Sequence, residues 1–184
     1  MARYVALLRG INVGGKNAVP MPALKAAFEG AGFRDVTTYI QSGNVLFDAP
    51  SSNQADLTRM VEGVIRKAFA HYEASVVLRS RSQMRAIVDR APNGFGTEPA
   101  TYRYDVAFLK PPLSAKAAIK DVSTKEGVDR IWAGTGVLYL SRLDSRATQS
   151  RLNRVAALPI YKNMTIRNWN TTTKLRALLD AKAR

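Results

Sequence analysis

One order of strand and helix patterns occurs twice along this chain of 184 residues, and it constrains the fold more than any single motif. Short apolar runs typical of strands alternate with stretches in which apolar residues recur at helical spacing. The same order returns about 100 residues later. The expected strands are 4–9, 36–40, 45–47 and 75–78 in the first half, and 104–110, 130–133, 137–140 and 164–167 in the second. The expected helices are 20–31, 55–69, 114–120 and 147–158, with a further short helix at 82–90 and a closing helix from near residue 172.

This β-α-β-β-α-β order is typical of the ferredoxin-like plait, in which two helices cover one face of a four-stranded antiparallel sheet. The predicted fold class is α+β, with two ferredoxin-like (βαββαβ) halves and an added C-terminal helix. A stretch rich in proline and glycine at 92–102 predicts the linker between the halves. We therefore expect an N-terminal half at 1–91, which ends in a trailing helix, and a C-terminal half at 103–184, which includes the final helix.

The composition excludes several kinds of chemistry. Because the chain has no cysteine, it has no disulfide, thiolate zinc site, iron–sulfur cluster or cysteine nucleophile. His71 is the one histidine, and no acidic pair stands at an informative spacing. General acid–base catalysis thus has no named candidate, and we expect neither a metal site nor a cofactor. No run approaches the roughly 20 apolar residues that span a bilayer, so we expect a cytoplasmic protein without a membrane partner.

The charge balance indicates an anionic partner. Lys and Arg number 28 against 14 Asp and Glu, which gives a net charge of +14 at pH 7. Residues 141–184 alone carry ten basic and two acidic side chains. Such a field attracts nucleic acid or a phosphorylated ligand, although a solvated basic surface has the same composition. Arg151 and Arg154 lie three apart on the helix expected at 147–158, where they form a basic face that can follow a phosphate backbone.

A glycine-rich pattern follows the first strand. Gly10 and Gly15-Lys16 satisfy G-x-x-x-x-G-K, the phosphate-binding loop of nucleotide hydrolases. The next residue, Asn17, lacks the hydroxyl that binds Mg²⁺, and the helix begins too late for its N-terminus to hold phosphate. Two interpretations remain. The loop is either a connection shaped for close packing or an anion-binding nest of backbone N–H groups with Asn12, Lys16 and Asn17.

A second string of polar residues lies in the first predicted hairpin. Ser42-Gly43-Asn44 supplies the positive-φ residues that a tight turn needs. Gln41 and Asn44 add amide donors and acceptors but no acid or base. Turn formation is the simplest interpretation of this string.

A third string leads from a strand into the closing helix. Asn170 or Thr171 can cap that helix, but capping does not explain the neighbouring charges. Arg167 and Lys174 lie at the positive end of the helix dipole, where cations are disfavoured unless an anion lies between them. An oxyanion site at this helix start and a core role for Trp169 both fit the sequence.

Three strings stand in order along the chain: YVALLRGINVGGKNAVPM, TYIQSGNVLF and TIRNWNTTTKL. In these strings the sequence resembles a bacterial family named domain of unknown function 1697. The resemblance implies a small α+β protein with plait-like halves, and it brings no activity or cofactor with it. It also implies that certain polar residues are the family's signature positions, here Arg9, Asn12, Gly14, Gly15, Lys16, Gln41, Ser42, Asn44, Arg167, Asn168 and Thr171.

Three hypotheses about function follow. The leading one is a phosphate- or polyanion-binding module, with nucleic acid as the first partner to test. Its site would combine the signature residues with Lys174, and would require distant glycine, amide and guanidinium groups to converge on one pocket. The second is an enzyme that acts on a phosphorylated small molecule through the loop from Gly10 to Asn17. The third is a structural or oligomeric protein whose signature loops only pack the two halves together.

Overall fold

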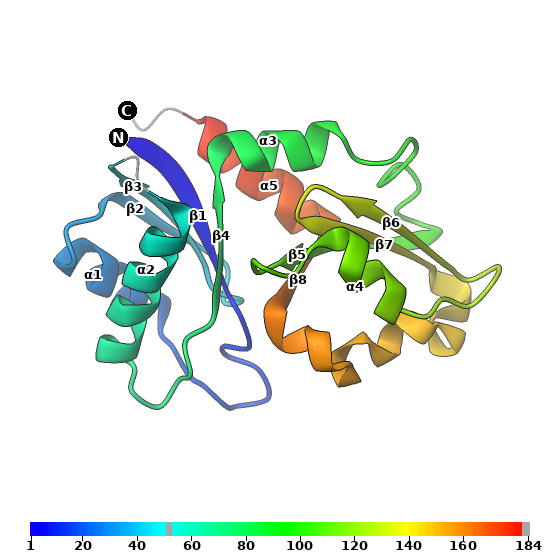
Figure 1. The fold of residues 1–184 in the computed structure, drawn as a ribbon, viewed down its shortest axis with the longest axis horizontal. Helices are drawn as coiled ribbons and strands as arrows, with labels where there is room; N and C mark the ends of the chain where they lie inside the picture. Colours follow the sequence, from blue (N-terminus) through cyan, green and yellow to red (C-terminus); the bar gives the residue numbers. More distant parts are fainter. Residues whose placement is uncertain (51–52, 182–184) are drawn as a thin grey trace. The chain divides into compact units, whose positions relative to one another are not determined.

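Each half of the chain is built on its own four-stranded antiparallel sheet in the computed structural model (Figure 1). The structure describes all residues except 51–52 and 182–184, so the last three residues of the predicted second half lie outside it. The chain separates into two compact units. Unit 1 is Met1–Met84 with Leu175–Arg184, and unit 2 is Arg85–Lys174.

Unit 1 contains the first predicted ferredoxin-like plait, and the structure confirms it. Its elements are β1 (Ala2–Leu8), α1 (Met21–Gly30), β2 (Arg34–Tyr39), β3 (Asn44–Ala49), α2 (Gln54–Ala68) and β4 (Val76–Ser80). The strands lie in the order β2-β3-β1-β4, and all neighbours are antiparallel. On the central strand β1, Val5 pairs with Leu46 of β3 and with Arg79 of β4.

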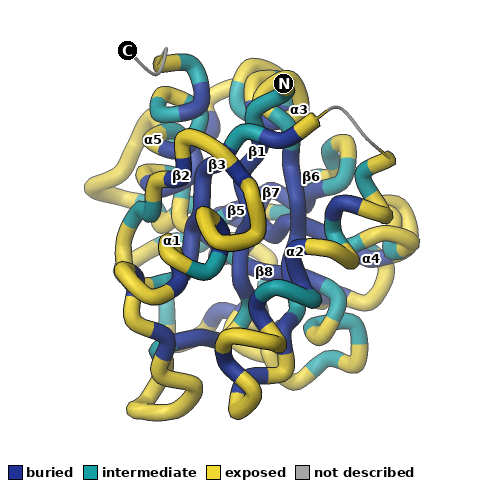
Figure 2. Tube along the Cα trace, turned by 90° about the vertical axis from the view of Figure 1, so that its left-hand side faces the viewer, coloured by how far each residue is buried: buried dark blue, intermediate teal, exposed yellow. Residues whose placement is uncertain are grey.

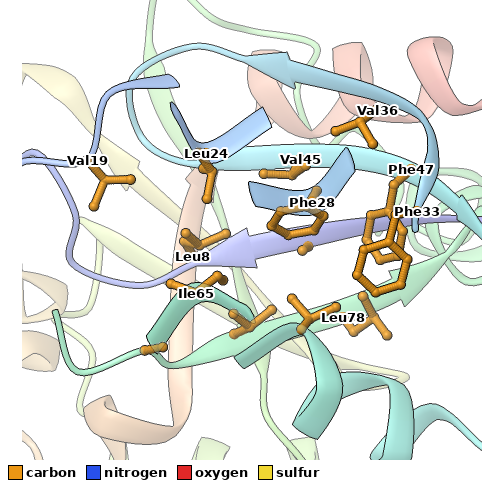
Figure 3. Packing of buried hydrophobic residues seen from close by; sticks show 14 of the residues in the cluster. Leu8, Val19, Leu24, Phe28, Phe33, Val36, Val45, Phe47, Ile65 and Leu78 are labelled. Atoms are coloured by element: carbon orange, nitrogen blue, oxygen red, sulfur yellow. The ribbon is translucent and has the colours of Figure 1, made fainter. Parts of the chain in front are cut away.

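The core of unit 1 follows from the alternation of side chains along β1. Ala6 and Leu8 share one face of the sheet, and they belong to the same buried cluster as side chains of α1 and α2. Both helices therefore cover that face. Phe28 of α1 lies beside Phe33 and Phe47 in this core (Figure 3), with its ring centroid 5.3 Å from that of Phe47. Figure 2 shows the central strands β1 and β3 as mainly buried.

The helices of unit 1 begin and face as their sequence predicts. α1 begins after Pro20, and a second proline lies in its first turn, where a missing N–H is tolerated. At the start of α2, the side chain of Asn53 accepts a hydrogen bond of 2.8 Å from a backbone N–H and caps the helix. Leu57, Val61 and Ile65 are buried and lie four residues apart, so one face of α2 packs on the sheet.

Unit 2 contains the second predicted plait. Its strands and regular helix are β5 (Tyr102–Leu109), α4 (Ala115–Asp121), β6 (Asp129–Gly134), β7 (Val137–Leu143) and β8 (Met164–Asn168). The strands lie in the order β6-β7-β5-β8, again with antiparallel neighbours. As in the first sheet, the second strand in sequence is at one edge, followed by the third, the first and the fourth. Two further helices flank this plait in the chain, α3 (Arg81–Asp89) and α5 (Trp169–Asp180). The segment predicted as a linker, 92–102, consists mainly of turns, and its Phe95 is buried.

The α-helix predicted at 147–158 is wrong. Three short 3₁₀ helices stand there, here named together the 3₁₀ segment: η1 (Asp144–Gln149), η2 (Arg151–Ala157) and η3 (Pro159–Asn163). Extended backbone at Ser150 separates the first two. Because residues three apart share a face of a 3₁₀ helix, Leu152 and Val155 are buried, whereas Ala156 is exposed. The second helix of the second plait is therefore replaced by a looser layer.

Candidate functional site

The glycine-rich loop of unit 1 follows β1 and turns tightly back on itself. Its backbone is left-handed at Gly10, Asn12, Gly14, Gly15 and Asn17. At the tip, Lys16 N donates a hydrogen bond of 3.0 Å to Val13 O, while the Lys16 side chain is exposed. At the base, the half-buried Arg9 accepts a hydrogen bond from Tyr72 Oη at its carbonyl oxygen. The loop is thus closed at its tip by its own backbone and held at its base by Tyr72.

Amide side chains fasten this loop to the rest of unit 1. Asn12 Nδ2 donates to Val19 O at 3.0 Å and to Gln41 O at 2.9 Å, and Asn12 Oδ1 accepts from Val19 N at 2.8 Å. Asn17 Nδ2 donates to Gly10 O at 3.0 Å. These bonds bring Asn12 to the backbone of Gln41 and fit the close-packing interpretation of the loop. Anion binding at this loop stays a prediction.

The first hairpin turn is packed tightly against the same loop. Asn44 is fully buried, and its Nδ2 donates to Tyr39 O at 2.9 Å and to Ser42 Oγ at 3.2 Å. Gly43 has a φ of 81°, and a Cβ atom at this position would collide with Ile11 of the loop. Glycine is therefore required here on two grounds, its backbone conformation and the lack of space.

A buried arginine occupies the last strand of each plait. Arg167 of β8 is 8% exposed, and its Nη1 donates to Thr165 Oγ1 at 2.9 Å. Arg79 of β4 is 5% exposed, and burial lowers its pKa to about 10, so it stays charged at neutral pH. Arg79 pairs with Val5 of β1, and Arg167 pairs with Val106 of β5, which is the matching strand. Sequence reasoning identified Arg167 and missed Arg79, although both stand fourth in their strands.

The cap of α5 differs from the prediction. Asn168 Oδ1 accepts a hydrogen bond of 2.8 Å from Thr171 N, so Asn168 caps the helix and α5 begins at Trp169. The predictions of a cap at Asn170 or Thr171 and of a start near residue 172 are wrong. Asn168 has the better position because it ends β8 in extended conformation, one residue before the helix. Lys174 is exposed.

The predicted site residues fall into two groups. Unit 1 holds Arg9, Asn12, Gly14, Gly15, Lys16, Gln41, Ser42 and Asn44, and unit 2 holds Arg167, Asn168, Thr171 and Lys174. Within unit 1, hydrogen bonds join the loop to the hairpin turn. Within unit 2, they join Asn168 to Thr171 at the start of α5. Convergence of the two groups on one pocket stays a prediction.

Aromatic side chains cover the sheet of unit 2 on the face away from α4. The Phe95 ring packs edge-on against Tyr104 of β5 and Tyr139 of β7, with centroids 4.9 and 5.3 Å away, and against Trp169 at 5.0 Å. Tyr139 Oη donates to Ile87 O at 2.6 Å, and burial raises the pKa of this hydroxyl. In RNA-recognition modules built on a four-stranded sheet, aromatic side chains of the sheet stack on the bases of single-stranded RNA. Here the Phe95 ring covers the aromatic side chains of the two central strands, β5 and β7, on that face.

A basic hollow lies beside the 3₁₀ segment. It has a volume of about 450 Å³ and is named here the basic pocket. Its lining residues are Lys125, Thr148, Gln149, Ser150, Arg151, Asn153 and Arg154. None of them is acidic, and three are cationic. The sequence pointed to Arg151 and Arg154 as one basic face, and both line this pocket although the predicted α-helix is absent. Lys125, which precedes β6, was missed because only the fold brings it there.

A buried carboxylate organises the wall of the basic pocket. Asp129, at the start of β6, is 8% exposed. Its Oδ2 accepts from Lys125 N and from Arg151 N, both at 2.8 Å, and its Oδ1 accepts from Ser150 Oγ at 2.5 Å. These three bonds occupy both carboxylate oxygens and hold Ser150 in the extended conformation that separates η1 from η2. Asp129 therefore shapes the pocket without lining it.

The cations of the basic pocket have few partners of their own. Arg151 Nη1 donates to Thr124 O at 3.3 Å. In the part of the chain that the structure describes, neither Lys125 Nζ nor the Arg154 guanidinium forms an ion pair or hydrogen bond. Nearby, Arg146 Nη2 donates a hydrogen bond of 2.8 Å to Gln149 Oε1. Arg146 is thus a fourth cation, next to a residue that lines the pocket. Among the described residues, no carboxylate forms an ion pair with Lys125, Arg151 or Arg154, although the buried Asp129 lies in the pocket wall.

The comparisons with known proteins bear on the family of the chain. A family model described as protein of unknown function (DUF1697) matches residues 1–139. The chain belongs to this family. The DUF1697 match includes the first two signature strings and ends within β7, before the 3₁₀ segment and the third string.

A solved structure extends the likeness to nearly the whole chain. The conserved bacterial protein SP0830 from Streptococcus pneumoniae is 27% identical, with a TM-score of 0.84. The match covers 97% of this chain and 99% of that one, so both plaits and the 3₁₀ segment fall within it. A comparison with curated proteins gave no match.

Within 1–50 and 53–181, no three or more His, Asp or Glu side chains are grouped so that they could hold a metal ion. None of the helices in those ranges has the length and apolar character needed to cross a bilayer.

Proposed function

We propose that this protein binds the phosphate group of a ligand in the basic pocket of unit 2. The observation that carries the proposal is that Lys125, Arg151 and Arg154 line one hollow without an acidic side chain. A phosphate carries up to two negative charges and accepts several charge-assisted hydrogen bonds, each stronger than a neutral one. Three cations around one concave surface supply both the field and the donors for such a group.

The uncharged lining supports the same proposal. Thr148 can donate its hydroxyl proton, and the Gln149 side chain can donate from its amide nitrogen. Ser150 is already committed, because its hydroxyl donates to Asp129. The pocket therefore combines cationic and neutral donors, as phosphate sites in proteins commonly do.

The charge of unit 2 reinforces the pocket. By sequence, residues 85–174 carry 15 basic and seven acidic side chains, a net charge of +8. In the 3₁₀ segment after Asp144, four basic side chains occur and no acidic one. A field of one sign around a hollow raises the local concentration of an anionic ligand. Phosphorylated metabolites and nucleic acids share this chemistry, and we expect the protein to meet either in the cytoplasm.

A titration with inorganic phosphate tests the proposal. The Arg154→Ala variant should bind phosphate about tenfold more weakly, because a tenfold loss corresponds to about 1.4 kcal/mol, the size of one charge-assisted hydrogen bond. Lys116→Ala is the matched control: it removes one exposed cation of unit 2 that does not line the pocket, and should change the affinity less than twofold. Equal losses in both variants, or no binding at about 50 mM salt, would contradict the proposal.

The source of the phosphate is tested by a second arm of the same experiment. If the ligand is a nucleic acid, a short single-stranded oligonucleotide should bind, and its affinity should fall steeply with salt because several counterions are released. If the ligand is a small phosphate ester, the oligonucleotide should bind no more tightly than inorganic phosphate. Arg154→Ala should weaken binding in either case.

A further inference from the structure

An apolar cavity adjoins the basic pocket in unit 2. It has a volume of about 330 Å³, and the basic pocket and this apolar cavity share Asn153 as a lining residue. Its apolar lining comes from the sheet and from the 3₁₀ segment: Leu140, Ile166, Leu152, Val155, Ala156 and Tyr161. The cavity stands where the second helix of a regular plait would pack, and it is within the usual size range of small-molecule sites.

The polar end of the apolar cavity is ordered around Arg142. Arg142 Nη1 donates to Asn153 Oδ1 at 2.6 Å, and Arg142 Nη2 lies 3.3 Å from Asp105 Oδ2. Asn153 Nδ2 in turn donates to Ala147 O at 2.9 Å. The wall shared by the two hollows is therefore a fixed side chain, held from both sides.

Two observations indicate that this end of the apolar cavity is poorly solvated. Burial raises the pKa of the Asp105 carboxyl, although Arg142 and Arg103 act in the opposite direction. In addition, Arg142 Nε is buried and has no hydrogen-bond partner among the residues that the structure describes.

We propose that the apolar cavity holds the apolar body of a phosphate monoester whose phosphate group lies in the basic pocket. The inference rests on the proposed function and narrows it to a small ligand with an aromatic or alkyl body. A hollow lined by cations lies beside a hollow that is lined mainly by apolar side chains, with Asp105, Arg142 and Asn153 at its polar end. This pair of hollows matches a molecule that is charged at one end and apolar at the other. An extended nucleic acid backbone, which offers a charge at every step, uses only the first hollow.

Three probes of equal or similar charge separate the two hollows. Inorganic phosphate reports on the basic pocket alone. Glycerol 3-phosphate adds a polar body, and phenyl phosphate adds an apolar one. The wild-type protein should bind phenyl phosphate at least tenfold more tightly than glycerol 3-phosphate, because only the phenyl ring gains from leaving water.

A pair of neighbouring alanines supplies the matched variants. Ala156 is exposed and lines the apolar cavity, so Ala156→Phe fills the cavity without removing a core side chain. Ala157 is exposed in the same 3₁₀ helix but does not line the cavity. In Ala156→Phe, the preference for phenyl phosphate should fall to less than twofold, with the affinity for inorganic phosphate unchanged. Ala157→Phe should keep the full preference.

The outcomes separate this inference from the proposed function. Suppose that inorganic phosphate binds, but that the wild-type protein does not prefer phenyl phosphate to glycerol 3-phosphate, or that Ala156→Phe keeps this preference. The inference is then overturned, while phosphate binding in the basic pocket stands. If inorganic phosphate does not bind at all, both fail. Should Ala156→Phe not fold, methyl NMR shifts of Leu140 and Val155 in the wild type decide the matter: they should move with phenyl phosphate and not with glycerol 3-phosphate, and equal movement would overturn the inference.

Discussion

The glycine-rich loop of unit 1 and the 3₁₀ segment of unit 2 both interrupt a ferredoxin-like plait, but their polar side chains differ in what they contact. In the loop, the side-chain amides of Asn12 and Asn17 donate hydrogen bonds to nearby backbone carbonyl groups. In the 3₁₀ segment, Arg151 and Arg154 line an open basic pocket. The amide side chains of the loop are thus mainly bound within the fold, although Lys16 is exposed, whereas the 3₁₀ segment places two cations in one pocket.

The same contrast holds for the position of the second helix. In unit 1, α2 buries Leu57, Val61 and Ile65 at regular helical spacing and completes the core. In unit 2, the 3₁₀ segment buries only Leu152 and Val155 from η2, and two hollows lie against it. The departure from a regular plait is therefore what creates the candidate site.

The largest expected effect sharpens the comparison on the side of unit 2. Asp129→Ala should lower the free energy of unfolding by about 3 kcal/mol, because three donors lose a buried charged acceptor. It should also abolish phosphate binding, since Asp129 holds Lys125 and Arg151 in place. Denaturant unfolding and phosphate titration measure the two effects. Asp121→Ala, at the exposed end of α4, is the control and should change stability by less than about 0.5 kcal/mol. Phosphate binding at wild-type strength in Asp129→Ala would contradict this role.

A smaller effect is expected in the loop of unit 1. Asn12→Ala removes three hydrogen bonds and should lower the free energy of unfolding by about 2 kcal/mol. The affinity for inorganic phosphate should stay within twofold of the wild-type value. Denaturant unfolding and the phosphate titration check both statements. If Asn12→Ala lost phosphate binding while keeping its stability, the loop would be a ligand site and the comparison would be reversed.

The smallest expected effect concerns pH. Burial raises the pKa of Asp105 above its ordinary value of 3.8, so the folded protein holds this proton more tightly than the unfolded chain. The stabilising contribution of the protonated carboxyl is complete below the unfolded value and is lost as the pH rises through the folded value. Asp105→Asn removes this titration. The stability of the variant relative to the wild type should therefore increase as the pH rises from about 3 to about 6. If the free energies of unfolding of the wild type and Asp105→Asn changed in parallel with pH, this prediction would be wrong.

Much of the fold could be predicted from the sequence, because its determinants are local. The apolar run of β1, the prolines at the start of α1 and the spacing of Leu57, Val61 and Ile65 each act over a few residues. The helix predicted at 147–158 failed for a long-range reason. Asp129 lies 22 residues before Arg151 in the chain and holds Ser150 and the Arg151 N–H in a conformation that no local pattern reveals.

The candidate site was predictable only in part, for the same reason. Arg151 and Arg154 are close in the sequence, and their spacing indicated one basic surface. Lys125 reaches the pocket through the folding of β6 and β7, and the apolar cavity depends on a helix that does not form. Neither feature leaves a signal within a short stretch of sequence.

The most direct test of the account is a map of where inorganic phosphate binds, obtained from backbone amide NMR shifts of the isotopically labelled protein. We expect the shifts to concentrate at Lys125 and at residues 148–154, with those of residues 10–17 unchanged. Shifts confined to residues 10–17 would contradict the account and would place the anion site in the glycine-rich loop of unit 1.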